Sequence, residues 1–90
     1  MSEVNLKINK RSSVTIQQQL IQQISNAIVS SELEQGDSLP SINLLSKKLK
    51  ISRDSVFKAY RELKQMNVVG STPAKGYYVT QQYKKVLLFK

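Results

Sequence analysis

Residues 15–31 carry apolar side chains at intervals of three and four, a spacing that places one stripe along an amphipathic helix. Thr15 and Gln18 fit the S/T-x-x-E/Q pattern of a helix start, in which each side chain satisfies an exposed backbone N–H. The sequence predicts a first helix of about four turns from Thr15, with a glutamine- and serine-rich outer face and an exit into a loop at Gly36. The stripe expected in the core contains Leu20, Ile21, Ile24, Ala27, Ile28 and Ser31.

A second apolar pattern starts after Pro40. Proline disfavours a helical conformation in the residue before it, and the Ser41 side chain is able to cap the N–H groups that follow. We therefore expect a second helix over residues 42–50. The side chains expected on its buried face are Ile42, Leu45 and Leu49, with Leu44 beside them.

Ser52 predicts the start of a third helix, because its side chain is a good cap and Asp54 follows in the first turn, near the positive end of the helix dipole. Only Ile51 separates this helix from the second one, and two helices so joined must cross steeply, as in a helix-turn-helix motif. The stripe expected to be buried is Val56, Ala59, Tyr60, Leu63 and Met66.

After Asn67 the pattern changes from helical to extended. Val68 and Val69 precede Gly70, and a polar run leads to the apolar segment 77–79. This arrangement is typical of a two-stranded hairpin whose tip contains Pro73 and Gly76. A lone hairpin is marginal in water, so we expect it to pack on the helices or to pair with a third strand. The fold class predicted is α+β.

The two ends of the chain differ from this central part. Residues 1–14 show a brief alternation at Val4, Leu6 and Ile8, which suggests an arm with a short strand; this arm is either a solvated terminus or a basic segment that contacts phosphates. Residues 81–90 end in the apolar run VLLFK, which is unlike a finished, solvated tail. We thus divide the chain into an arm at 1–14, a domain at 15–80 and a linker or the start of another domain at 81–90.

Composition limits the possible functions. The chain has 90 residues, enough for one small domain, and a formal net charge of +8, which points to nucleic acid or an anionic membrane surface. It contains no Cys and no His, so the usual nucleophiles, imidazole bases and zinc ligands are missing, and we expect neither an enzyme nor a cofactor. No apolar run approaches the roughly 20 residues of a membrane span, and a cytoplasmic protein is expected.

The basic residues gather around the expected helix-turn-helix. A solvated surface with internal ion pairs, such as Lys58 with Glu62, is the simpler interpretation. The position of the charges favours DNA instead, because a helix that opens with small polar residues is able to enter a major groove. The basic residues in question are Lys47, Lys48, Lys50, Arg53, Lys58, Arg61 and Lys64.

The third helix divides into base-reading and phosphate-binding positions. Arg53 is the candidate for a two-pronged contact to guanine, worth roughly 1 to 3 kcal/mol of discrimination. Ser55 and Phe57 are candidates for a base edge or a thymine methyl group. Asp54 either accepts from cytosine, orients Arg53, or serves only the helix start.

Other basic positions are expected to bind the DNA backbone, where contacts position the protein without specifying sequence. The candidates on the helices are Lys47, Lys48, Lys58 and Arg61. Lys75, beside Gly76 at the hairpin tip, either reaches a minor groove or phosphate or is basic by chance.

Four motifs occur in a fixed order along the chain: G-D-x-L-P-S at 36–41, S-R-x-S-V at 52–56, A-Y-x-x-L at 59–63 and G-Y-x-V at 76–79. With the first helix, they make the run 18–79 resemble the amino-terminal winged helix-turn-helix domain of the GntR family of bacterial transcription regulators. The resemblance implies three helices and a wing of two or three strands, and it implies binding to operator DNA.

The family's DNA contacts, carried over by position, are Ser41, Ser52, Arg53, Ser55 and Gly76. Three positions depart from the family pattern. Asn43 and Phe57 stand where many members have arginine, and Ala74 replaces the first glycine of the wing tip. Asn43 is able to donate to a phosphate or an adenine, whereas Phe57 has no donor.

Family members usually carry a carboxy-terminal domain that binds a small effector and dimerises. The resemblance therefore implies a homodimer on a pseudo-palindromic operator, with VLLFK as the opening strand of an effector domain; alternatively, the chain is a complete small protein whose tail dimerises it. The predicted function is sequence-specific DNA binding in a transcriptional regulator. The alternative is a winged-helix module that binds RNA or an acidic protein, because a basic helix suits any polyanion.

Overall fold

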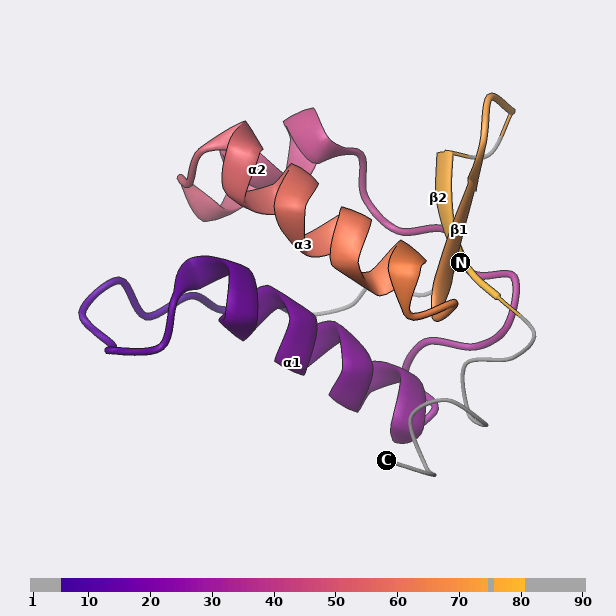
Figure 1. Cartoon of the computed structure of the whole chain (residues 1–90), viewed down its shortest axis with the longest axis horizontal. Coiled ribbons are helices and arrows are strands. Elements are labelled where there is room, and N and C mark those ends of the chain that lie inside the picture. Colours follow the sequence, from indigo (N-terminus) through magenta and orange to yellow (C-terminus); the bar gives the residue numbers. More distant parts are fainter. Residues whose placement is uncertain (1–5, 75, 81–90) are drawn as a thin grey trace.

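The computed structural model describes residues 6–74 and 76–80, which form three helices followed by two antiparallel strands. The elements are α1 (Ile16–Val29), α2 (Ile42–Leu49), α3 (Arg53–Gln65), β1 (Val69–Thr72) and β2 (Gly76–Val79). Helix α3 contacts α1, α2 and β1, so it is the element on which the others assemble (Figure 1). The predicted α+β winged helix-turn-helix is confirmed, with a two-stranded wing.

All three predicted helix starts are confirmed. Each begins after a hydroxyl residue in extended conformation whose side-chain oxygen accepts a hydrogen bond of 3.1 Å from the N–H three residues later. The caps are Thr15, Ser41 and Ser52, and the donors are the N–H groups of Gln18, Leu44 and Ser55. Local hydrogen bonds, readable in the sequence, therefore set where each helix begins.

The first helix has the predicted length of about four turns but ends well before the predicted exit at Gly36, and the second helix ends one residue earlier than predicted. Helix α1 stops at Val29, because Ser31 takes a left-handed conformation with φ of 69°, well before Gly36. Helix α2 stops at Leu49, because Lys50 does the same with φ of 57°. Left-handed residues are usually glycine or asparagine, so a serine and a lysine in this role gave no signal in the sequence.

The core lies between the helices and the wing. Side chains on the predicted stripes of α1 and α3 fill it, with Tyr60 the largest fully buried residue. Ile21, Ile42, Leu49 and Met66 are only half-buried at its edge, and Leu44 is 59% exposed. The buried apolar residues are Leu6, Leu20, Ile24, Ala27, Ile28, Leu33, Leu39, Leu45, Val56, Ala59, Tyr60, Leu63, Val68, Val69 and Val79.

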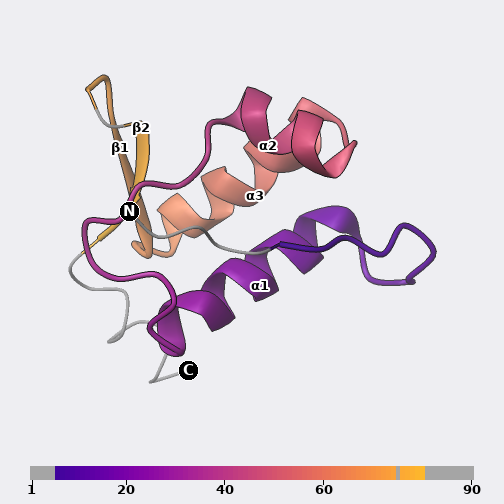
Figure 2. The same cartoon turned by 180° about the vertical axis from the view of Figure 1, so that it is seen from behind.

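The segment before α1 lies against that helix (Figure 2), with Leu6 and Ile8 packed on the core and most of its other described residues, Lys10 and Arg11 among them, exposed. Leu6 belongs to the core, with 6% of its surface exposed. The predicted strand is absent from residues 6–14, and Val4 lies outside the described residues. The backbone of this segment is hydrogen-bonded by two glutamine side chains of α1 and not by a neighbouring strand. Gln19 bonds to the backbone of Asn9, and Gln23 bonds to the backbone of Lys7.

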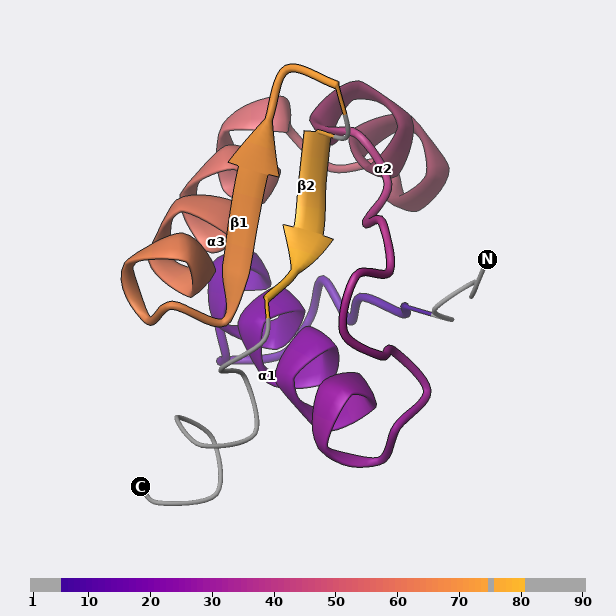
Figure 3. The ribbon, with the colours of Figure 1, turned by 90° about the vertical axis from the view of Figure 1, so that its right-hand side faces the viewer.

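The wing is a short hairpin in which Val69 faces Val79 and Thr72 faces Gly76. Its second strand is paired on both edges. On the side away from β1, the segment 36–39 forms a single antiparallel bridge at Ser38 and three backbone hydrogen bonds of 2.8 to 2.9 Å. The wing is therefore fastened to the chain that leads into α2, and it stands beside α2 and α3 (Figure 3).

Candidate nucleic-acid interface

The turn between α2 and α3 fixes the geometry of the interface. Lys50 is left-handed, and the N–H of Ile51 returns to the carbonyl of Ser46 at 3.0 Å, which closes the end of α2. Ser52 then opens α3. Lys10, from the segment before α1, donates from Nζ to the Lys50 carbonyl at 2.6 Å, a contact across 40 positions of sequence that the pattern did not predict.

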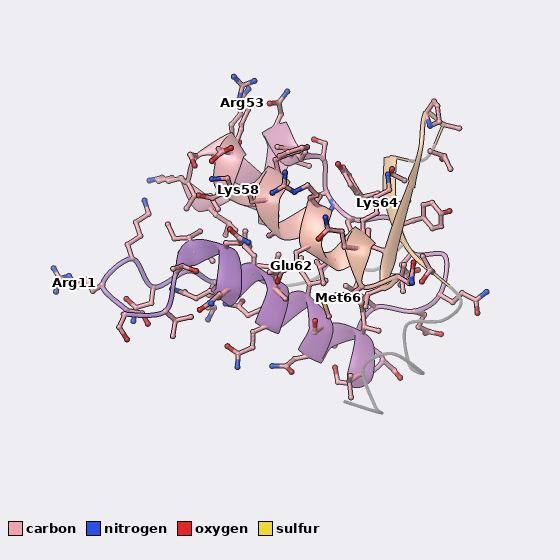
Figure 4. The ribbon with its side chains drawn as sticks, in the orientation of Figure 1. Arg11, Arg53, Lys58, Glu62, Lys64 and Met66 are labelled. Carbon is pink, nitrogen blue, oxygen red and sulfur yellow. The ribbon has the colours of Figure 1, made fainter. Side chains whose placement is uncertain are left out.

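The exposed side of α3 carries side chains that pair with one another. Arg53 lies on the side of α3 away from α1, whereas Glu62 and Met66 lie between α3 and α1 (Figure 4). Four contacts organise this face. They are Asn43 with Arg53, Ser52 with Ser55, Asp54 with Lys58, and Phe57 with Arg61.

Arg53 and Asn43 join the two helices of the motif. Nη1 of Arg53 donates to Oδ1 of Asn43 at 3.2 Å, and both side chains are exposed. Of the three roles predicted for Asp54, the orientation of Arg53 is thus taken by Asn43. The bond uses one of the five guanidinium donors, so the remaining donors stay available for a base or a phosphate.

Ser52 and Ser55 form a compact polar start to α3. Their hydroxyl oxygens lie 2.9 Å apart, and Ser52 also accepts the N–H of Ser55. Small side chains let the helix approach base edges closely.

Asp54 pairs with Lys58, one turn further along α3. Oδ2 of Asp54 lies 3.0 Å from Nζ of Lys58, and the two side chains are 68% and 48% exposed. Lys58 thus pairs within α3, as the simpler interpretation of a solvated surface allowed, but its partner is Asp54 and not the Glu62 given there as an example. Exposed pairs of this kind contribute only about 0 to 1 kcal/mol, so Lys58 is able to leave Asp54 for a phosphate.

Phe57 is the aromatic member of the face and is 43% exposed. The guanidinium carbon of Arg61 lies 5.8 Å from the centroid of its ring, within cation–π distance. The ring and the guanidinium therefore support one another on the outer surface of α3.

The wing tip approaches the start of α2. Ser41, Asn43 and Gly76 line one open groove of about 440 Å³, together with Leu39, Ile42 and Tyr77. The groove thus brings Gly76 of the wing close to Ser41 and Asn43 at the start of α2, although Gly76 lies more than thirty positions further along the chain. The prediction for Lys75 lies outside the described residues.

The remaining lysines divide into free and structural ones. Lys47 and Lys48 are exposed on the last turn of α2. Lys64 is exposed too, but its Nζ donates to the hydroxyl of Ser71 at 3.0 Å and so ties α3 to the wing. This structural role was not predicted, because it depends on how β1 returns along α3.

Tyr60 holds the interface helices in place from the buried side. Its hydroxyl donates to the Pro40 carbonyl at 2.8 Å, and its ring meets that of Tyr77 edge-on, with 4.7 Å between centroids. Burial, followed by the neighbouring phenol of Tyr77, raises the pKa of Tyr60 far above its ordinary value. Tyr60 is therefore a neutral hydrogen-bond donor that links α3 to the start of α2 and to the wing.

Within residues 6–74 and 76–80, acidic side chains do not gather in groups of three or more that could hold a metal ion. Across the same residues, every helix is too short or too polar to cross a bilayer.

Comparison with known sequences points to one family. Residues 16–79 match the sequence model of the bacterial regulatory proteins of the gntR family. The HTH-type transcriptional repressor YtrA of Bacillus subtilis (strain 168) is 30% identical over 83 residues, which are 92% of this chain and 64% of the repressor. The chain thus spans less than two thirds of the length of that relative.

Solved structures show the same fold. YtrA from Sulfolobus acidocaldarius, a GntR-family transcription factor, superposes with a TM-score of 0.81 at 31% identity, over 92% of this chain and 87% of that one. AraR(DBD) in complex with operator ORX1 superposes with a TM-score of 0.73 over 89% of this chain and all of that one. Its identity is 19%, so this second likeness supports the fold alone.

Proposed function

Because the chain belongs to the gntR family of bacterial regulatory proteins, and residues 16–79 form the family's helix-turn-helix DNA-binding domain, we propose that α3 enters the major groove of a specific operator. The observation that carries this proposal is the joined pair Asn43 and Arg53 at the exposed start of α3. A guanidinium held at the tip of a helix suits the two acceptors of guanine. The function is binding and not catalysis, as the family relatives are transcriptional regulators.

The other candidates take supporting roles. Ser41, Ser52 and Ser55 lie at helix starts, where backbone N–H groups and hydroxyls suit phosphates or bases. Lys48, Lys58 and Arg61 neutralise the DNA backbone, Lys58 after leaving Asp54. Lys75 and Gly76 bring the wing to the flanking groove.

The whole protein is proposed to be an effector-responsive regulator. Its domain division is an arm at 1–14, the DNA-binding domain at 15–80, and a linker or the start of an effector-binding domain at 81–90. Such a regulator binds as a homodimer to a pseudo-palindromic site, because two recognition helices then meet equivalent half-sites. A protein that regulates bacterial transcription acts in the cytoplasm, where the chromosome lies.

The test is selection of preferred duplexes from a random pool, followed by binding assays over a range of salt concentrations. Arg53→Ala is expected to lose roughly 5- to 150-fold discrimination at one guanine. Lys48→Ala is expected to weaken binding to every duplex alike and to flatten the slope of log affinity against log salt by about one. Gln22→Ala, at an exposed position on α1, serves as the control.

The outcomes separate the proposal from its alternative. A preferred duplex with the two contrasting variant effects supports operator binding. The absence of any preferred duplex, or binding to RNA that matches or exceeds binding to DNA, would overturn it in favour of a general polyanion-binding module.

A further inference from the structure

Phe57 is a large apolar side chain on a surface that otherwise suits charged and polar ligands. It is 43% exposed, while its neighbour Val56 is completely buried. The other exposed large apolar residues within the described ranges are Val14, Val29 and Leu44, none of which lies on α3. Burying the exposed part of an apolar side chain is favourable, so this ring is a favourable contact for any apolar group that meets it.

The ring lies between two arginines on one stripe of α3. Residues four apart on a helix are neighbours, so Arg53, Phe57 and Arg61 follow one another along the same face. The Arg61 guanidinium carbon, 5.8 Å from the ring centroid, restricts the movement of the ring. Cationic ends on both sides bring the ring toward DNA, because both are attracted to its phosphates.

The chemistry of the major groove then limits what the ring is able to contact. Base edges there present hydrogen-bond donors and acceptors, and thymine adds the apolar C5-methyl group. The phenylalanine ring neither donates nor accepts conventional hydrogen bonds, so a polar edge beneath it would lose water without replacement. A thymine methyl group has no hydrogen bond to water to lose, so its burial against the ring is favourable.

We infer that Phe57 recognises a thymine by its methyl group, with Arg61 holding the ring in place. This inference rests on the proposed operator binding. The advance along a helix over four residues is about 6 Å, close to two base-pair steps of 3.4 Å. The thymine is therefore expected about two base pairs from the guanine that depends on Arg53.

The test replaces each thymine of the preferred duplex, one at a time, by deoxyuridine, which removes the methyl group and keeps every hydrogen-bonding atom. Loss of one buried methyl group is expected to weaken binding of the unaltered protein about fourfold at one position of each half-site. In Phe57→Ala the same substitution is expected to have no effect. Leu44→Ala, which truncates another exposed apolar side chain, is expected to keep the fourfold penalty.

A second pair of variants guards against loss of binding or folding in Phe57→Ala. Phe57→Leu keeps an apolar surface and is expected to keep a uracil penalty, whereas Phe57→Gln, of similar size, is expected to lose it. The inference is overturned if no thymine is sensitive to deoxyuridine, or if the penalty persists in both Phe57→Ala and Phe57→Gln. Failure of operator binding itself would appear earlier, as a selection that yields no preferred duplex.

Discussion

The side-chain amide oxygen of Asn43 accepts a hydrogen bond of 3.2 Å from Nη1 of Arg53, and this bond links the first turn of α2 to the first residue of α3. The exposed amide of Asn43 and the exposed guanidinium of Arg53 are thus joined to each other. The amide restricts an arginine that would otherwise sample many rotamers, and restricting it lowers the entropy lost when it binds a base. Asn43 is in this view a positioning residue for Arg53.

Replacement of Asn43 by alanine is expected to reduce the preference for the guanine read by Arg53. The loss corresponds to one exposed hydrogen bond of about 1 kcal/mol, or roughly fivefold in relative affinity. Binding of the preferred duplex and of variants at that base pair, measured by fluorescence anisotropy, gives the discrimination directly. Asn26→Ala, on the exposed side of α1, provides a matched control. Unchanged discrimination in Asn43→Ala would show that Arg53 positions itself.

Stability above about pH 10 is expected to depend on Tyr60. Burial raises the pKa of this phenol in the folded chain, while the unfolded chain releases the proton near pH 10. Above that pH the unfolded state binds fewer protons than the folded state, so the contribution is complete below about pH 10 and decreases as the pH rises.

Urea unfolding near pH 7 and near pH 10.5 tests this expectation against Tyr60→Phe. The variant is expected to lose about 1 kcal/mol near neutral pH, because the Pro40 carbonyl loses its donor. It is also expected to lose less stability than the unaltered protein between the two pH values. Equal losses would mean that other groups dominate the alkaline transition.

Gln19 is expected to hold the segment before α1 on the domain. It is only 8% exposed, and it accepts the N–H of Asn9 while donating to the carbonyls of Asn9 and Val14. Gln19→Ala leaves these groups without their partners, at a cost of about 1 to 3 kcal/mol in the free energy of unfolding. Urea unfolding measures the cost, and trypsin cleavage at Lys10 or Arg11 should become faster.

The control for this prediction is Gln22→Ala, on the same helix but exposed. Exposed substitutions of this kind usually change stability by no more than about 0.5 kcal/mol. If both variants unfold alike, the hydrogen bonds of Gln19 contribute nothing beyond those of water.

Features set by short-range chemistry were predictable from the sequence. The caps at Thr15, Ser41 and Ser52, the buried stripes and the hairpin depend on residues that are close together in the sequence. The left-handed residues Ser31 and Lys50 were not predictable, because neither residue type favours that conformation. Helix starts were thus predicted correctly while two helix ends were not.

Contacts across long sequence distances were the main omission. The apolar periodicity of α1 places the glutamines, Gln19 among them, on a polar outer face. It does not show whether the amide of a glutamine bonds to water or, as Gln19 does, to the backbone of the segment before the helix. Likewise, the sequence placed Asn43 and Arg53 among the candidates but did not indicate their hydrogen bond. Such pairs depend on the angle between α2 and α3, which follows from the conformation of Lys50.

Gly70 in the wing is expected to be required by the ring of Tyr78 on the opposite strand. These residues face each other across the hairpin, and a Cβ atom at Gly70 would lie 2.9 Å from Cζ and from the hydroxyl oxygen of Tyr78. Gly70→Ala therefore forces the half-buried ring of Tyr78 aside, and because only the far end of that side chain has to move, the expected cost is at most about 1 kcal/mol, measured by urea unfolding. The same substitution in a Tyr78→Ala background is expected to cost little, because the clash is gone. A cost that is equal in both backgrounds would mean that the backbone at Gly70, and not the ring of Tyr78, demands glycine.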